Sequence, residues 1–240
     1  MNIQFYLPSS KIKDEIIVFD EQESKHISQV LRLSVGDQIQ LTDGEGGKYS
    51  AIITQLVKGQ VQAKVVTHEF QSKPLASISI ALASLHKRDR LEWAIEKSVE
   101  LGVDTFYLFE AERSEYPRWK QERLSHIMIS AAKQSKRCWY PRLVIKNSAL
   151  EIVEDFEQRM QEQTYSMFVA HEGAQTDWDS LEIKPEESRL YFVGPEGGFS
   201  ELEIEELANA SARSFIMGSA NDAQILRSET AVVSLLAKHY

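Results

Sequence analysis

The chain has 240 residues, 42% of them hydrophobic and 26% charged, a composition typical of a soluble globular protein with room for one large domain or two modest ones. The single cysteine, Cys138, excludes an intrachain disulfide and a cysteine-based metal cluster, and the six histidines lack ligand spacing, so no metal is expected. The first residues show no secretory signal and no apolar run reaches membrane-spanning length. We therefore expect a cytoplasmic protein without a membrane partner.

Charge is distributed unevenly along the chain. The formal net charge is −9, which alone argues against binding to nucleic acid. Residues 113–146, however, hold nine basic and two acidic side chains, whereas residues 149–210 hold three basic and sixteen acidic ones. The basic block is either a footprint for a polyanion or a solvated helix face.

Residues 1–72 are predicted to form a β-domain. Short runs of β-branched and aromatic residues predict strands at 4–7, 15–19, 38–41, 49–56 and 60–66. A short helix is expected at 21–33, and the glycine-rich run 43–47 predicts a hairpin. Several short, closely spaced strands favour a small barrel.

After a linker at 72–74, strands and helices alternate through 73–240, which predicts an α/β domain with a mostly parallel sheet. The expected strands are 77–85, 105–109, 165–170, 189–193 and 214–218. Helices are expected from Asp89 as N-cap to Gly102, from Pro117 past Ala131, over 150–161, over 200–208, and from Ser228 as N-cap to His239.

One strand, 189–193, ends abruptly in the loop Gly194-Pro-Glu-Gly-Gly198. Ser200 and Glu203 fit a capping box that opens the next helix. Three glycines, a proline and a carboxylate in five residues favour a ligand site over an ordinary tight turn, because glycine lets a ligand approach the backbone.

The terminal helix, 229–239, is apolar on more than one face. A helix of this kind is buried on both sides, either against the sheet of its own chain or against another subunit.

Several runs together resemble one family, the bacterial small-subunit ribosomal RNA methyltransferase E family, which methylates N3 of a uridine in 16S rRNA. The matching runs include His26–Leu33, Arg88–Lys97, Glu112–Ser114, Ala132–Gln134, Gly194–Ser200 and Leu226–Ala231. The last two together are highly specific.

The resemblance implies an N-terminal PUA-like RNA-binding β-barrel (1–72) and a C-terminal SPOUT methyltransferase domain (73–240) with a deep trefoil knot. It also implies a homodimer, S-adenosylmethionine as cofactor, and 16S rRNA of the small ribosomal subunit as partner. The alternatives are a non-catalytic RNA- or ribosome-binding protein, and a SPOUT enzyme that acts on another position such as a ribose 2'-hydroxyl.

On the family pattern the adenosine lies among three loops. The cofactor residues implied are Ala170, His171, Glu172, Gly194, Pro195, Glu196, Gly197, Gly198, Met217, Gly218, Ile225, Leu226, Thr230 and Ala231. The third loop departs from the pattern, because residues 219–224 lengthen it and Gln224 stands in place of an arginine.

Three residues are candidates for catalysis. Arg227 could stabilise the anion that develops when uridine N3 loses its proton, and Glu229 or Glu196 could accept that proton or face the sulfonium. For Glu229 the alternative is a favourable charge at a helix N-terminus, and for Arg227 a structural ion pair.

The basic block supplies candidates for RNA contact, with Trp139 and Tyr140 available to stack on bases. The candidate RNA-binding residues are Arg32, Arg88, Arg113, Lys133, Lys136, Arg137 and Arg142.

Overall fold

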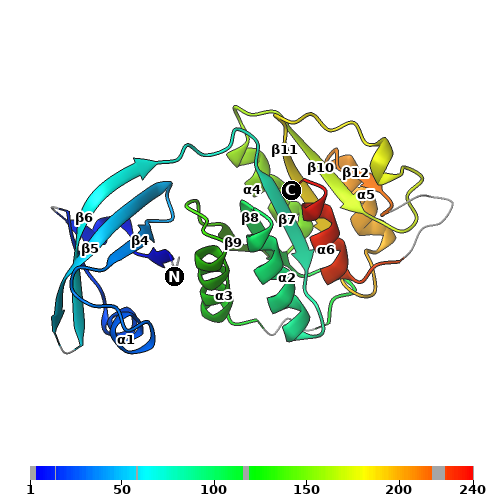
Figure 1. Ribbon diagram of the computed structural model, residues 1–240. Helices are drawn as coiled ribbons and strands as arrows, with labels where there is room; N and C mark the ends of the chain where they lie inside the picture. Colours follow the sequence, from blue (N-terminus) through cyan, green and yellow to red (C-terminus); the bar gives the residue numbers. More distant parts are fainter. Residues whose placement is uncertain (1–3, 14, 58, 116–118, 218–224, 240) are drawn as a thin grey trace. The chain divides into compact units, whose positions relative to one another are not determined.

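The computed structural model describes residues 4–13, 15–57, 59–115, 119–217 and 225–239 (Figure 1). By its internal contacts the chain divides into two compact units. The first contains Met1–Lys73 and Ala132–Tyr140, and the second contains Pro74–Ala131 and Pro141–Tyr240. In the described ranges, no helix combines the length and apolarity needed to cross a membrane.

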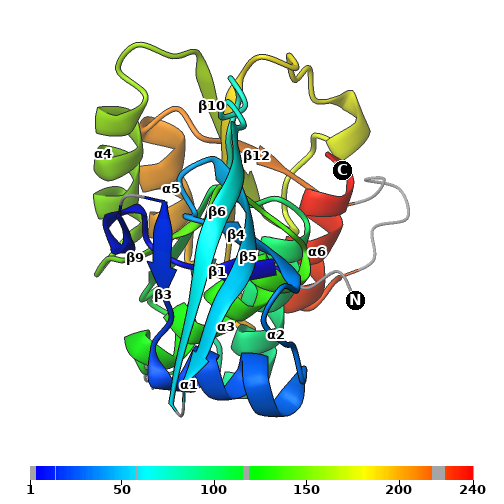
Figure 2. The same ribbon diagram turned by 60° about the vertical axis from the view of Figure 1, so that its left-hand side comes forward.

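The first unit is built on one six-stranded sheet in the order β1-β4-β5-β6-β3-β2. Its elements are β1 (Gln4–Tyr6), η1 (Ser9–Lys11), β2 (Ile12–Lys13), β3 (Ile16–Val18), α1 (Glu21–Lys25), the π-helical turn η2 (His26–Val30), β4 (Gln38–Thr42), β5 (Gly47–Val57) and β6 (Gln60–Phe70). The long β5–β6 hairpin is prominent in Figure 2. The expected strands, the short helix and the hairpin after β4 are confirmed.

The sheet of the first unit curls around an apolar core. Phe5 in β1 and Phe19 after β3 lie far apart in the strand order, yet their rings meet edge to face with centroids 5.7 Å apart. Ile17, Ile27 and Leu41 are fully or almost fully buried in the same cluster. A curled sheet closed over one core is the barrel-like arrangement that the strand pattern predicts.

Residues 132–140 pack into the first unit, although they lie beyond the expected 1–72 domain. The Gly46 amide donates to the Cys138 carbonyl (2.9 Å) and the Tyr140 amide to the Gly44 carbonyl (2.8 Å). The Gln4 side chain donates to the Arg137 carbonyl (2.9 Å). These contacts join positions about a hundred residues apart, so local sequence patterns contain no signal for them. We call Ala132–Tyr140 the docked segment.

The second unit contains an all-parallel six-stranded sheet in the order β12-β10-β11-β7-β8-β9. The strands are β7 (Ile78–Ala83), β8 (Thr105–Phe109), β9 (Arg142–Ile145), β10 (Tyr165–Ala170), β11 (Ser188–Val193) and β12 (Arg213–Phe215). The other elements are α2 (Arg88–Glu100), α3 (Gln121–Gln134), α4 (Ala149–Arg159), η3 (Trp178–Ser180), α5 (Glu201–Asn209) and α6 (Ser228–Ala237). The last three residues of α3 belong to the docked segment of the first unit. The predicted parallel sheet is confirmed.

One strand of the second sheet, β9, was not predicted. β9 is a four-residue edge strand whose residues are only half-buried or exposed, so it lacks the continuous apolar run of a central strand. Its first residue, Arg142, belongs to the basic block, so only the three apolar residues that follow it indicate a strand.

Two predicted helix caps were wrong. α2 begins at Arg88 with Lys87 as N-cap, so Asp89 lies in the first turn, where its negative charge favours the helix N-terminus. α6 has Arg227 as N-cap, and Ser228 is its first helical residue. The Ser228 hydroxyl does not cap the helix because it donates to the Gly194 carbonyl.

The terminal helix α6 covers the sheet of its own chain. It packs against α2, β7 and β11, and Val232, Leu235 and Leu236 are fully buried (Figure 1). Of the two arrangements left open by its sequence, burial within its own chain is the one observed for these side chains.

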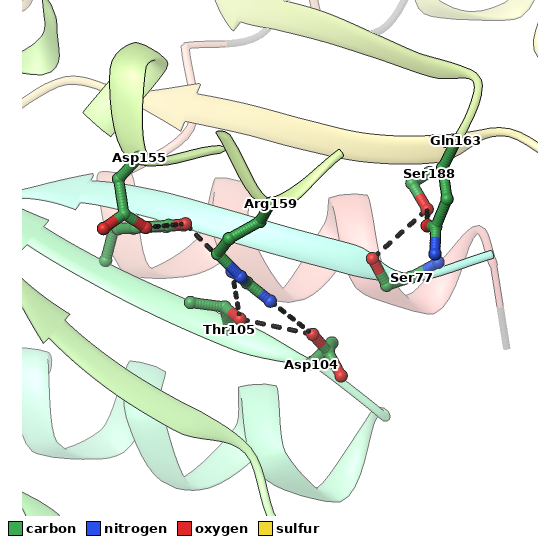
Figure 3. A network of polar contacts seen from close by, with 8 residues as sticks. Ser77, Asp104, Thr105, Asp155, Arg159, Gln163 and Ser188 are labelled. Carbon is green, nitrogen blue, oxygen red and sulfur yellow. Dashed lines mark hydrogen bonds and ion pairs between the residues drawn. The ribbon is translucent and has the colours of Figure 1, made fainter. Parts of the chain in front are cut away.

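At the amino ends of the strands, polar contacts tie α4 to β8 (Figure 3). Arg159 donates to the Thr105 hydroxyl (2.8 Å) and the Tyr107 hydroxyl (2.9 Å), and pairs with Asp104 (3.1 Å). The Tyr107 hydroxyl in turn donates to Asp155 (2.8 Å). We call this set the amino-edge network.

Candidate active site

The carboxyl ends of the parallel strands meet at one edge of the second sheet. β7 and β11 are neighbours there, but the chain continues from β7 to β8 on one side and from β11 to β12 on the other. In parallel sheets, ligands bind in the crevice that opens where the connections diverge. The loop after β11 is Gly194–Gly198, which the sequence singles out as a ligand loop.

The glycine loop is a tight turn that leads directly into α5. The Gly198 amide donates to the Pro195 carbonyl (2.9 Å), and Gly198 has a φ of +69°, which favours glycine. The capping box of Ser200 and Glu203 is confirmed in both of its hydrogen bonds. A Cβ at Gly194 would approach the Phe199 ring to 3.1 Å, whereas one at Gly198 would meet no heavy atom within 4 Å. The loop is therefore closely packed at its start and open at its end.

Two neighbouring segments hold the glycine loop. From the start of α6, the Ser228 hydroxyl donates to the Gly194 carbonyl at 2.8 Å, and this contact is buried. From the segment after β8, Arg113 Nη1 donates to the Gly197 carbonyl at 3.2 Å. The two most specific sequence motifs, Gly194–Ser200 and Leu226–Ala231, thus come together in space.

Arg90 connects the two candidate catalytic carboxylates. Its Nη1 lies 3.8 Å from Glu196 Oε1 and its Nε lies 3.5 Å from Glu229 Oε1. The amide of His86, in the loop after β7, lies 3.4 Å from Glu196 Oε2. Sequence reasoning missed Arg90 as a site residue. Its position in the matched run 88–97, just after a central strand, was the available signal.

Glu229 is buried and incompletely paired. The residue is 8% exposed, and its Oε2 atom has no hydrogen-bond partner within the described part of the chain. Arg90 is shared with Glu196, so one positive charge faces two negative ones. A buried carboxylate oxygen without a partner is costly, which indicates a place for a polar or charged ligand.

The strand register aligns the other expected cofactor loops with the glycine loop. Ala170 pairs with Val193 on one side and with Phe215 on the other, so His171, Gly194 and the residues after β12 leave the sheet at one level. The His171 amide donates to the Phe215 carbonyl at 2.9 Å. The remaining candidates differ in exposure.

Pro195 and Ala231 are buried, whereas Glu172, Gly197, Ile225 and Thr230 are exposed. Leu226 and Met217 are intermediate. Gly218 and the lengthened part of its loop lie outside the described residues.

The expected RNA-binding residues fall into both units. Arg113 is engaged with the glycine loop, Arg88 pairs with Glu92 at 3.2 Å, and Lys133 pairs with Glu23 at 2.5 Å. The other four, Arg32, Lys136, Arg137 and Arg142, are exposed or half-exposed. The basic block is thus divided between the docked segment and the second unit.

Two aromatic side chains proposed to stack on bases are already packed in the first unit. The Tyr140 ring stacks on Tyr6 with centroids 4.7 Å apart. The Trp139 indole donates to the Gln71 carbonyl at 2.8 Å and meets Phe70 edge to face. Their observed role is to hold the docked segment.

Comparisons with known proteins agree with this architecture. Residues 71–239 match the model of an RNA methyltransferase domain, and residues 19–66 match that of an RNA methyltransferase PUA domain. The fold is therefore that of an RNA methyltransferase with a PUA domain.

Three relatives make the assignment more specific. The ribosomal RNA small subunit methyltransferase E of Bacillus subtilis is 31% identical over 90% of this chain and 86% of its own length. A probable rRNA methyltransferase from Porphyromonas gingivalis is 29% identical, with a TM-score of 0.84 over 98% of this chain and 96% of that one. The methyltransferase E of Neisseria gonorrhoeae, solved with S-adenosyl methionine, is 24% identical, with a TM-score of 0.82 over 99% and 96%. The chain belongs to the ribosomal RNA small subunit methyltransferase E family, which confirms the resemblance found in the sequence.

Proposed function

We propose that this protein transfers a methyl group from S-adenosylmethionine to N3 of a uridine in 16S rRNA of the small ribosomal subunit. The observation that carries the proposal is the meeting of the glycine loop with the start of α6. There the Ser228 hydroxyl bonds the Gly194 carbonyl, and Arg90 faces both Glu196 and Glu229. Family membership and the cofactor of the Neisseria relative support the same reaction.

The residues present fit such a cofactor. The open space at Gly198 allows close approach to the backbone, and the unpartnered Glu229 Oε2 offers a negative atom. We assign the binding of the cofactor to Ala170–Glu172, Gly194–Gly198, Met217 and the Ile225–Leu226 pair. When bound, S-adenosylmethionine supplies an electrophilic methyl group on a sulfonium.

The uridine must lose its N3 proton before it can be methylated. Side chains of this protein accept that proton and stabilise the negative charge that develops on the base. Arg227 is exposed at the N-cap of α6, where its guanidinium is available to the uridine O2 or O4 as negative charge develops. Glu196 is exposed, whereas Glu229 is buried beside Arg90. We therefore assign the proton to Glu196 and a role in charge balance to Glu229.

Nucleoside mass spectrometry tests this function. The purified protein is incubated with S-adenosylmethionine and either 16S rRNA or assembled small subunits from cells that lack the enzyme. We expect N3-methyluridine from the unaltered protein and almost none from Arg227→Ala. A ribose-methylated product would assign a different reaction, and RNA binding without any product would indicate a non-catalytic protein.

The homodimer implied by the family is part of the proposal. α6 buries one side against its own sheet, while Val233 is only half-buried. Light scattering at low protein concentration, alongside the activity assay, tests the requirement for a dimer. A fully active monomer would refute it.

A further inference from the structure

Three charged groups that face one another at the carboxyl edge of the second sheet do not balance. Arg90 is 3.8 Å from Glu196 and 3.5 Å from Glu229, both longer than an ordinary hydrogen bond. One guanidinium thus faces two carboxylates, and the group as a whole has a net charge of −1. We call Arg90, Glu196 and Glu229 the anionic clasp.

Burial makes the imbalance of the clasp significant. The Glu229 side chain is 10% exposed and that of Arg90 is 23% exposed, so solvent screens this pair only weakly. Glu229 Oε2 has no hydrogen-bond partner among the described residues. An under-neutralised buried carboxylate is stabilised by a cation, and the clasp lies beside the loop to which we assign the cofactor.

The proposed cofactor carries a suitable cation, which the reaction removes. Transfer of the methyl group turns the positively charged sulfonium into a neutral thioether, as in S-adenosylhomocysteine. The amino acid part of the molecule keeps its ammonium and carboxylate in both forms, so these groups cancel in a comparison of the two. Only the sulfonium charge distinguishes them for an electrostatic site.

We propose that the anionic clasp recognises the sulfonium charge, so that the protein binds S-adenosylmethionine more tightly than S-adenosylhomocysteine. The inference rests on the proposed methyltransferase function. Binding of the charged cofactor offsets the unpaired charge of Glu229, and loss of that charge weakens the hold on the product. The clasp thereby favours release of the thioether after each turnover.

Calorimetric titration with three ligands tests the proposal without an activity assay. The ligands are S-adenosylmethionine, S-adenosylhomocysteine, and sinefungin, which carries an amine in place of the methylated sulfonium. In Glu229→Gln, the preference for S-adenosylmethionine over S-adenosylhomocysteine should fall about tenfold, a difference of about 1.4 kcal/mol. Sinefungin should lose affinity in parallel with S-adenosylmethionine. Glu196→Gln should also lower the preference for S-adenosylmethionine over S-adenosylhomocysteine, but by less.

Glu205→Gln is the matched control, because Glu205 is an exposed carboxylate on α5, the helix that follows the same loop. It should leave the preference unchanged. Thermal unfolding establishes that each variant is folded, and the exposed Glu196 remains informative if Glu229→Gln is unstable. A preference unchanged in both clasp variants, or an equal loss for all three ligands, would overturn the proposal. Failure of the unaltered protein to bind any of the ligands would instead refute the proposed function.

Discussion

The two edges of the parallel sheet use the same kinds of charged residue in different ways. At the amino edge, Arg159 makes contacts of 2.8, 2.9 and 3.1 Å with Thr105, Tyr107 and Asp104. At the carboxyl edge, the nearest carboxylate oxygens lie 3.5 and 3.8 Å from Arg90. The guanidinium of Arg159 therefore has close partners, whereas that of Arg90 lies between two carboxylates at distances longer than an ordinary hydrogen bond.

The balance of charge differs in the same way. Arg159 pairs with Asp104, and Lys146, which follows β9, pairs with Asp155 at 3.1 Å, so each carboxylate of the amino-edge network has a cation of its own. Burial alone would raise the pKa of Asp155, but hydrogen bonds from Tyr107 and Lys146 hold it below its ordinary value. A satisfied network of this kind stabilises the fold, and an incomplete one keeps bonding capacity for a ligand. The amino edge should therefore respond to mutation in stability, and the carboxyl edge in binding and turnover.

The largest effect is expected from Arg227→Ala at the carboxyl edge. Loss of a group that meets developing negative charge should lower kcat by about a hundredfold or more. Affinity for S-adenosylmethionine should stay within about twofold, since the proposed partner of Arg227 is the uridine. Single-turnover methylation together with calorimetry measures both quantities. An equal loss in turnover and affinity would move Arg227 to the cofactor site.

A second prediction compares the two guanidinium groups directly through stability. Arg159→Ala should lower the free energy of unfolding by about 3 kcal/mol, because it removes the cation that pairs with Asp104 and the donor to the Thr105 and Tyr107 hydroxyls. Arg90→Ala should cost about 1 kcal/mol, because its ion pairs are long. Urea unfolding measures both. The comparison fails if Arg90→Ala is the more destabilising variant.

The local structure around the candidate site could be predicted from the sequence. The glycine loop, the capping box of Ser200 and the parallel sheet each depend on neighbouring residues, so their patterns are visible in the chain. The family resemblance, rather than any local pattern, predicted that the segment Leu226–Ala231 lies near that loop. Arg90 escaped notice as a site residue because its role depends on Glu196 and Glu229, which are more than a hundred residues away.

Long-range packing also explains the remaining differences. Ser228 has the chemistry of an N-cap, but tertiary structure gives its hydroxyl to Gly194. Trp139 and Tyr140 lie in a basic run typical of RNA contact, yet they hold the docked segment to the first unit. In each case the local sequence suggests one role for a side chain, but the side chain instead contacts a residue far away in the sequence. Local patterns contain no information about such contacts.

A third prediction concerns α6, which begins at the carboxyl edge with Ser228 and Glu229 and is followed by Lys238 and His239. The His239 ring contacts the Tyr191 hydroxyl at 2.8 Å. Burial, with Arg189 and Lys238 nearby, lowers the pKa of His239 from 6.5 to about 4. Above pH 6.5 the ring is neutral in both folded and unfolded chains. Between pH 6.5 and about 4, His239 gains a proton only in the unfolded chain. The free energy of unfolding should therefore decrease as the pH is lowered through this range.

His239→Gln should remove this part of the pH dependence. Urea unfolding of both proteins at about pH 7.5 and about pH 5 measures it, and the loss on acidification should be smaller in the variant. An identical pH dependence in His239→Gln and the unaltered protein would contradict the assignment.

The smallest expected effect extends the contrast between paired and unpaired charges to the docked segment. Lys133 pairs with Glu23 at 2.5 Å, whereas Lys136 is exposed and has no ion pair within the described ranges. If Lys136 contacts a phosphate of the RNA, Lys136→Gln should make the salt dependence of RNA affinity shallower by about 0.7 for a single strand or about 0.9 for a duplex. Lys133→Gln should change it less, since its charge is already neutralised by Glu23. Fluorescence anisotropy with a 16S rRNA fragment at several salt concentrations gives both slopes. Equal changes in the two variants would show that pairing with Glu23 does not withhold Lys133 from RNA, and no change in either would leave the segment a solvated surface.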